Sequence, residues 1–158
     1  MKKRQLIISS TFTIFACIAS TTFATANQSQ TSNPKLPCRI EVSVAHISTD
    51  FFEKTGRRAV KVDAFSKCNV PQSKITLTVE IRKVGAFGSH LVWTTTVKSS
   101  GTTFPGNQVN NYGTYRICRN KTPTRYYGVA FSKAFIAGKW QYARHVLSRE
   151  ITSIQCGT

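Results

Sequence analysis

Three histidines and six carboxylates are the residues of this sequence that could carry acid–base chemistry. Two imidazoles, or an imidazole and a carboxylate, can cleave a phosphodiester when Lys or Arg holds the phosphate. A basic chain with His46, His90 and His145 therefore has a secreted ribonuclease as its leading enzyme alternative. His46 is in phase with apolar Val42 and Val44, which favours a half-buried, hydrogen-bonded ring. Nothing local links the three histidines, so we expect no catalytic residue.

Other catalytic and cofactor chemistries lack their motifs. The sequence has no G-x-S-x-G elbow, no H-E-x-x-H, no phosphate loop and no glycine-rich dinucleotide motif. Glu41 and Glu80 fall on outward strand positions, which favours surface carboxylates over a glycosidase pair. No C-x-x-C is present, and no histidine lies two to five residues from a cysteine. We therefore expect no metal and no cofactor.

Basic and aromatic side chains interleave between Tyr112 and Arg144. Basic groups neutralise phosphate or sulfate, and aromatic faces stack on bases or sugars. The predicted polyanion-binding residues of this stretch are Arg116, Arg119, Lys121, Arg125, Lys133, Lys139 and Arg144, and Arg57 with Arg58 forms a second, smaller patch. Strands with aromatic residues inward and solvated cations outward would give the same pattern without a ligand.

The net charge is +16, and it is compatible both with polyanion binding and with a solvated basic surface that binds no ligand. It attracts polyanions in a salt-dependent way, but it also keeps a protein soluble. Residues 1–26 have the features of a secretory signal peptide, with a basic start, a short apolar run and cleavage after Ala26. Removing it leaves 19 − 6 = +13 and no transmembrane segment in the mature chain. We expect a secreted, extracellular protein with a flexible leader at 27–37 and one domain at 38–158.

Four cysteines remain after removal of the signal peptide, and an even number in a short exported chain predicts a disulfide framework. Four cysteines allow about three pairings. We expect Cys38 to pair with Cys68 and Cys118 with Cys156, because each pair then occupies strand positions in one half of the chain.

The clearest structural signal is two alternating segments around Gly85-Ala86-Phe87-Gly88. Residues 75–81 and 91–97 alternate with a period of two and predict a half-buried hairpin. Six to eight such strands predict an all-β, antiparallel, immunoglobulin-like β-sandwich of about seven strands, with a small β-barrel as the alternative. The Cys–Trp–Cys spacing of true immunoglobulin domains is absent, because Trp93 lies too far after Cys68.

The remaining segments are assigned from their pattern and their turn residues. We expect single strands at 38–46 and 60–68, strands at 115–119 and 127–131, and a bulge or a break into two strands within 140–156. We expect a polar connection at 50–58, whose Phe51 and Phe52 plug one end of the core, loops at 110–113 and 132–139, and a turn at 120–124 around Pro123.

The order of these pieces is similar to that of small secreted proteins of Gram-positive, especially actinobacterial, bacteria. The matching residues are Cys38, Val60-Lys61-Val62, Cys68, the strand at 75–81, Cys118 and Cys156. Such proteins are largely uncharacterised four-cysteine β-sandwiches. The resemblance implies a fold and a compartment, and no active site.

The sequence therefore predicts a non-catalytic, basic binding domain for an anionic polymer or surface, such as a cell-wall polymer, a sulfated glycan or nucleic acid. The alternative binding function is protein recognition or adhesion through the long loops at 50–58, 100–112 and 132–139. A secreted ribonuclease-like enzyme is the third possibility.

Overall fold

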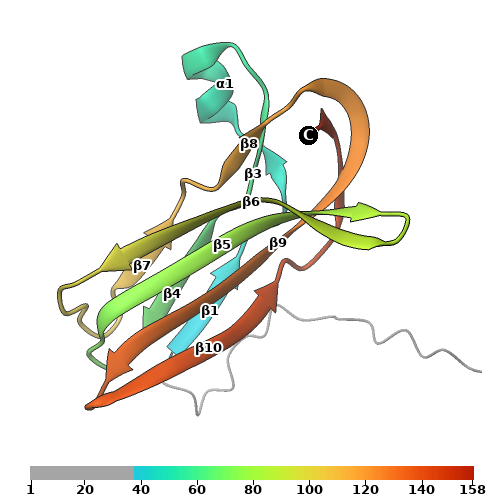
Figure 1. The fold of residues 1–158 in the computed structure, drawn as a ribbon. Coiled ribbons are helices and arrows are strands. Elements are labelled where there is room, and N and C mark those ends of the chain that lie inside the picture. The colour runs from blue at the N-terminus through green and yellow to red at the C-terminus, as the bar shows by residue number, and fades with distance from the viewer. Residues whose placement is uncertain (1–37) are drawn as a thin grey trace, which may run out of the picture.

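The computed structural model describes residues 38–158 as two facing layers of antiparallel β-sheet with one short helix (Figure 1). This is the predicted sandwich, and the sheets do not close into a barrel. The expected signal peptide at 1–26 and the leader at 27–37 lie outside the described residues. No helix in 38–158 is long and apolar enough to cross a membrane.

The front layer has the strand order β10-β9-β5-β6, and its centre is the predicted hairpin. β5 (Ser73–Gly85) and β6 (Gly88–Ser99) pair along their whole length. β9 (Asn120–Ile136) lies on the other side of β5, and β10 (Lys139–Leu147) pairs with β9. β11 (Thr152–Gly157) pairs with the first half of β9. Apolar residues of β5 face inward and are fully buried, namely Ile75, Leu77, Val79 and Ile81.

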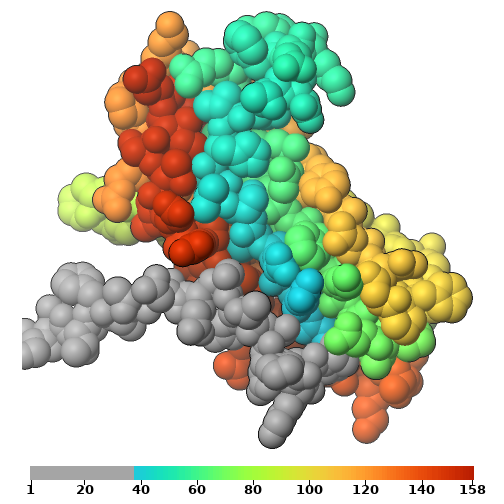
Figure 2. Space-filling model, turned by 180° about the vertical axis from the view of Figure 1, so that it is seen from behind, coloured from blue at the N-terminus to red at the C-terminus, as the bar shows by residue number. Residues whose placement is uncertain are grey.

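The back layer consists of two three-stranded sheets, and Figure 2 shows it from behind. One sheet contains β1 (Cys38–Val42), β4 (Ala64–Cys68) and β7 (Gln108–Asn111). The other contains β2 (His46–Ile47), β3 (Ala59–Lys61) and β8 (Tyr115–Ile117).

The expected single strands at 38–46 and 60–68 are each divided in two, and this correction partly explains why residues 38–158 form eleven strands where about seven were predicted. Both divisions occur at the same place, where Ser43 and Asp63 bind each other. The Ser43 backbone N–H donates to the Asp63 carbonyl at 2.8 Å, and the Asp63 N–H donates to Ser43 Oγ at 2.9 Å. These bonds replace regular ladder pairing, so the chain passes from one back sheet to the other.

The polar connection expected at 50–58 is instead a helix, α1 (Thr49–Thr55). Ser48 Oγ accepts the Phe51 N–H and caps its first turn, and Gly56, with φ 67°, ends it in the left-handed conformation. Phe52 is exposed and does not plug the core, whereas Phe51 packs on Tyr115 with ring centroids 4.8 Å apart.

Three further loop assignments were wrong because strands continue through them. Pro123 lies within β9 opposite Gln155 of β11. This part of β9 pairs only with β11, so the missing proline N–H costs no ladder bond on its other side. Residues 132–136 also belong to β9, and Ala137 and Gly138, both with positive φ, make a two-residue hairpin turn. Asn110 and Asn111 belong to β7.

Of the bulge or break predicted within 140–156, the structure has the break, since β10 ends at Leu147 and β11 begins at Thr152. Both predicted disulfides are also confirmed. Cys38 and Cys68 are direct partners in the β1–β4 ladder, and Cys118–Cys156 ties the end of β8 to β11.

Candidate polyanion-binding site

An open cleft of about 610 Å³ lies where the end of α1, the β8 strand and the edge strand β6 meet. It is lined by Arg57, Trp93, Tyr115, Arg116, Ile117, Cys118 and Arg119. Three of the nine basic residues predicted to bind polyanions therefore share one concave surface with two aromatic side chains. The two patches expected from sequence, one near 57 and one from 112 onward, meet here.

Arg116 and Trp93 make the central contact of this cleft. The guanidinium carbon of Arg116 lies 5.1 Å from the centroid of the Trp93 ring, within the range of a cation–π interaction. Trp93 lies opposite Ile81 and so occupies an inward position. Because β6 is at the edge of its sheet, the indole is not covered and remains 42% exposed.

Arg57 reaches the cleft because α1 ends beside it. The Arg57 N–H donates to Thr55 Oγ1 at 3.2 Å, and that hydroxyl donates to the Phe51 carbonyl at 2.7 Å. The contact between Phe51 and Tyr115 holds the helix against β8. The helix is thus a support that places a cation, and its sequence signals are the Ser48 cap and Gly56.

Arg119 is held by the C-terminal strand. Its backbone N–H donates to the Gly157 carbonyl at 2.7 Å, and the preceding Cys118 N–H donates to the Arg58 carbonyl at 2.9 Å. The Cys118–Cys156 disulfide joins the same two segments. The segments that carry Arg58 and Arg119 are therefore fixed to each other and to β11 by backbone hydrogen bonds and a disulfide.

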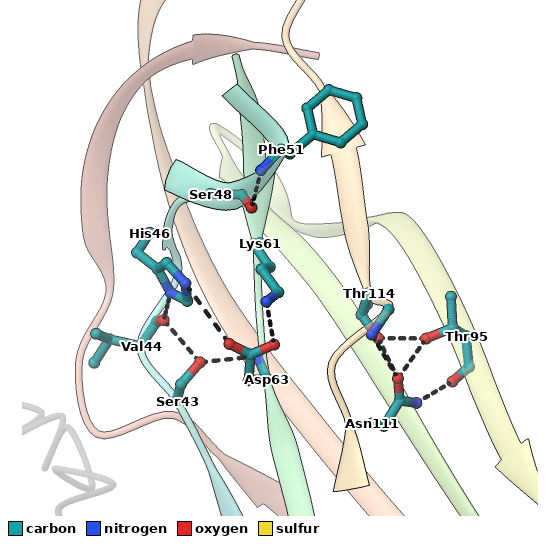
Figure 3. Close-up of polar contacts among 11 residues, drawn as sticks. Ser43, Val44, His46, Ser48, Phe51, Lys61, Asp63, Thr95, Asn111 and Thr114 are labelled. Atoms are coloured by element: carbon teal, nitrogen blue, oxygen red, sulfur yellow. Dashed lines mark hydrogen bonds and ion pairs between the residues drawn. The ribbon is translucent and has the colours of Figure 1, made fainter. Parts of the chain in front are cut away.

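A buried polar network positions the two sides of the cleft relative to each other (Figure 3). Asn111 is fully buried, and its Oδ1 accepts hydrogen bonds from the hydroxyls of Thr95 and Thr114 at 3.1 and 3.2 Å. Thr95 is two residues from Trp93 on β6, and Thr114 is two residues from Arg116 on β8. The Asn111 side chain therefore fixes the strands that bring the cation and the ring together.

The strands β6 and β8 carry no acidic residue, whereas the adjacent helix α1 carries Asp50 and Glu53. From residue 81 to residue 149 the sequence has eleven Lys and Arg and no Asp or Glu. The ion pairs of the described chain join Arg39 to Glu41, Lys61 and His46 to Asp63, and Arg82 to Glu80, and none includes a cleft arginine.

Arg82 differs from the cleft arginines because its charge has an internal partner. Its hydrogen bond to Glu80, 2.7 Å long, raises the pKa of its guanidinium above the usual value. The cleft guanidinium groups have no such carboxylate in the described part of the chain, so their charge is available to an external anion.

The other predicted basic residues lie outside the cleft. Arg58 is half-buried beside it, and Lys121 and Arg125 are exposed on the first half of β9. Lys133, Lys139 and Arg144 lie at the opposite end of β9 and on β10, where Lys133 Nζ is 5.3 Å from the Trp140 ring centroid. Lys121 and Lys133 are separated along β9 by about 40 Å of strand. This is several Debye lengths at physiological salt, so the two groups act separately.

The three histidines lie on different elements. His46 on β2 is half-buried, as expected, and its Nδ1 bonds the Val44 carbonyl at 3.0 Å, while Nε2 faces Asp63 (Figure 3). The His90 ring packs over Gly85 in the β5–β6 hairpin. The His145 ring stacks on Phe131 at 4.6 Å. Within residues 38–158 no hydrogen bond or ion pair joins one histidine to another, and no group of three or more metal-ligating side chains occurs.

Comparison of this chain with family models, with curated proteins and with solved structures gives no match. The support for the candidate site is therefore its own geometry. Sequence reasoning identified its arginines but not Trp93, which it used only as a strand residue. The sequence signal that could have identified Trp93 was an aromatic residue on a strand that could lie at the edge of a sheet.

Proposed function

We propose that this protein binds an anionic polymer outside the cell through the cleft of Arg57, Arg116 and Arg119, without covalent chemistry. The observation that carries the proposal is the convergence of three arginines, from two segments far apart in the sequence, on a concave surface where none is paired with a carboxylate of the described residues. Maintaining unpaired like charges together disfavours the folded state, so an external anion is the natural complement.

The residue types point to phosphate or sulfate groups on the polymer. Each guanidinium has a planar fork of donors that binds such groups with two hydrogen bonds. Trp93 and Tyr115 offer aromatic surface beside those charges for a sugar ring or a base. Sulfated glycans, phosphate-bearing cell-wall polymers and nucleic acid all present this combination.

An extracellular location is supported by two disulfides, which persist in oxidising compartments, and by the signal-like residues 1–26. A non-catalytic role is supported by the distribution of the histidines over three elements, which provides no acid–base pair around the arginines.

The test compares two variants with the same change in charge. One replaces Arg57, Arg116 and Arg119 with Gln, and the other replaces Lys133, Lys139 and Arg144 with Gln. Affinity for heparin and for single-stranded DNA is measured over a range of salt concentrations. We expect the cleft variant to lose at least about 100-fold in affinity and to reduce the salt slope by about 2 to 3. The control variant should retain most of the affinity and most of the salt slope.

Equal losses in the two variants would show that binding depends on total charge and would overturn the cleft as the site. Failure of the unmodified protein to bind either polymer would overturn the proposed function itself. Circular dichroism and thermal unfolding of both variants establish that each is folded.

A further inference from the structure

The tip of the β5–β6 hairpin projects beyond both layers. β5 pairs with β9 as far as Lys83, which lies opposite Tyr126, and no third strand accompanies the hairpin beyond that point. Figure 1 shows this ribbon extending past β9 at the right, and Figure 2 shows it projecting at the left from behind. Its turn contains Gly85-Ala86-Phe87-Gly88, and the His90 ring covers the space above Gly85.

Phe87 stands at the end of this ribbon with its side chain 100% exposed. Water therefore surrounds a whole aromatic ring at the point farthest along the hairpin, next to exposed Ala86. Farther back on β6, Leu91 is also half exposed. A fully exposed aromatic ring at a projecting end is suited to insertion into an apolar phase.

The hairpin behind the tip is basic. It carries Arg82, which is paired with Glu80, Lys83, whose Nζ also donates to the Thr158 carbonyl at 3.3 Å, and His90. Beyond Glu80 the hairpin has no carboxylate. Nearby β9 adds the exposed Arg125, next to the residue opposite Lys83. An apolar tip followed by cations matches the profile of an anionic bilayer, in which phosphates lie above hydrocarbon.

We propose that the hairpin is an interfacial membrane anchor, in which Phe87 enters the headgroup–acyl boundary of an anionic bilayer and Lys83 and Arg125 meet the lipid phosphates. This surface is separate from the arginine cleft and does not depend on it. The anchor would hold the protein on a membrane while the cleft remains open to a polymer. Because one aromatic ring with a few cations is a weak anchor, the attachment is reversible.

The test is co-sedimentation with vesicles of phosphatidylcholine alone and of an equal mixture of phosphatidylcholine and phosphatidylglycerol. It uses the unmodified protein, Phe87→Ser, and Phe104→Ser as the matched control. Phe104 is 65% exposed in the β6–β7 connection and is not on this hairpin. We expect binding to the anionic vesicles only, a loss of about tenfold for Phe87→Ser, and no change for Phe104→Ser.

A second measurement reports insertion directly. In Phe87→Trp, brominated anionic lipids should quench the fluorescence of the new indole beyond the quenching seen for the unmodified protein, which contains Trp93 and Trp140. The anchor would be overturned by any of three results. These are absence of that additional quenching, an equal loss of vesicle binding in both serine variants, and equal binding to neutral and anionic vesicles. Heparin affinity of Phe87→Ser should be unchanged, so failure of the anchor and failure of the cleft are distinguishable.

Discussion

Asn111 and Thr95 bind each other twice. The Thr95 hydroxyl donates to Asn111 Oδ1 at 3.1 Å, and Asn111 Nδ2 donates to the Thr95 carbonyl at 3.2 Å. The same amide donates to the Leu77 carbonyl at 3.4 Å and accepts from the Gly113 N–H at 3.3 Å. One buried side chain therefore connects β5, β6 and the segment that leads into β8, and it sets the position of Arg116 relative to Trp93.

Asn111→Ala should reduce both stability and polymer affinity. The substitution removes the buried amide that bonds the Thr95 and Thr114 hydroxyls and the Thr95 and Leu77 carbonyls, so we expect a loss of about 2 to 4 kcal/mol in the free energy of unfolding, measured in urea. Asn110→Ala is the neighbouring control, because Asn110 Oδ1 has no hydrogen-bond partner in the described structure. Equal destabilisation by the two changes would contradict the structural role of Asn111.

The two disulfides should have similar effects on stability and different effects on binding. They close segments with sequence separations of 30 and 38 residues, so replacing either pair with serine should cost about 3 to 4 kcal/mol. Only loss of Cys118–Cys156 releases the segment that carries Arg119. Heparin affinity should therefore fall in Cys118→Ser/Cys156→Ser and persist in Cys38→Ser/Cys68→Ser, measured where each is folded. A larger loss of heparin affinity in Cys38→Ser/Cys68→Ser than in Cys118→Ser/Cys156→Ser would contradict the cleft as the binding site.

Gly128→Ala should destabilise the sandwich at the closest approach of its layers. A Cβ at Gly128 would lie 2.5 Å from Val62 Cγ1 and 3.0 Å from Val42 Cγ2. Forcing the layers apart should cost about 1 to 3 kcal/mol. Gly101→Ala is the control, since a Cβ there meets nothing within 4 Å. The measurement is the midpoint temperature of thermal unfolding of the two variants. An unchanged midpoint for Gly128→Ala would show that the two layers can move apart at no cost in stability.

Tyr126→Phe should loosen the C-terminal strand. The buried Tyr126 hydroxyl donates to the Cys156 carbonyl at 2.5 Å and lies 3.1 Å from Thr158 Oγ1. Its removal should cost about 1 to 2 kcal/mol and increase hydrogen exchange in β11. Tyr142→Phe, at an exposed position of β10, should change neither quantity. Protection of β11 amides that is identical in both variants would refute this role.

Polymer binding through the cleft should not change between about pH 5 and pH 9, because guanidinium groups remain protonated throughout this range. A contribution from histidine would instead make the affinity depend on pH within this range. Heparin affinity at constant ionic strength measures this directly. A decline in affinity with rising pH that is removed by substituting one of the histidines would move the site away from the arginines.

Features that depend on local pattern could be predicted from the order of the amino acids alone. Alternation of apolar and polar residues across 75–81 and 91–97 predicted the hairpin, because side chains of a strand point to opposite faces in turn. The same reasoning predicted a bulge or a break within 140–156 and placed each cysteine pair in one half of the chain. The Ser48 cap and Gly56 were also present as local signals for α1.

Contacts between residues far apart in the chain could not be predicted in this way, because they depend on how the strands pack. Arg116 and Trp93 are brought together by strand order, by the edge position of β6 and by Asn111, none of which a local period contains. The splitting of two strands at Ser43 and Asp63 likewise depends on bonds between segments twenty residues apart. Local periodicity fixes which face of a strand is apolar, whereas long-range packing fixes which strand lies beside it.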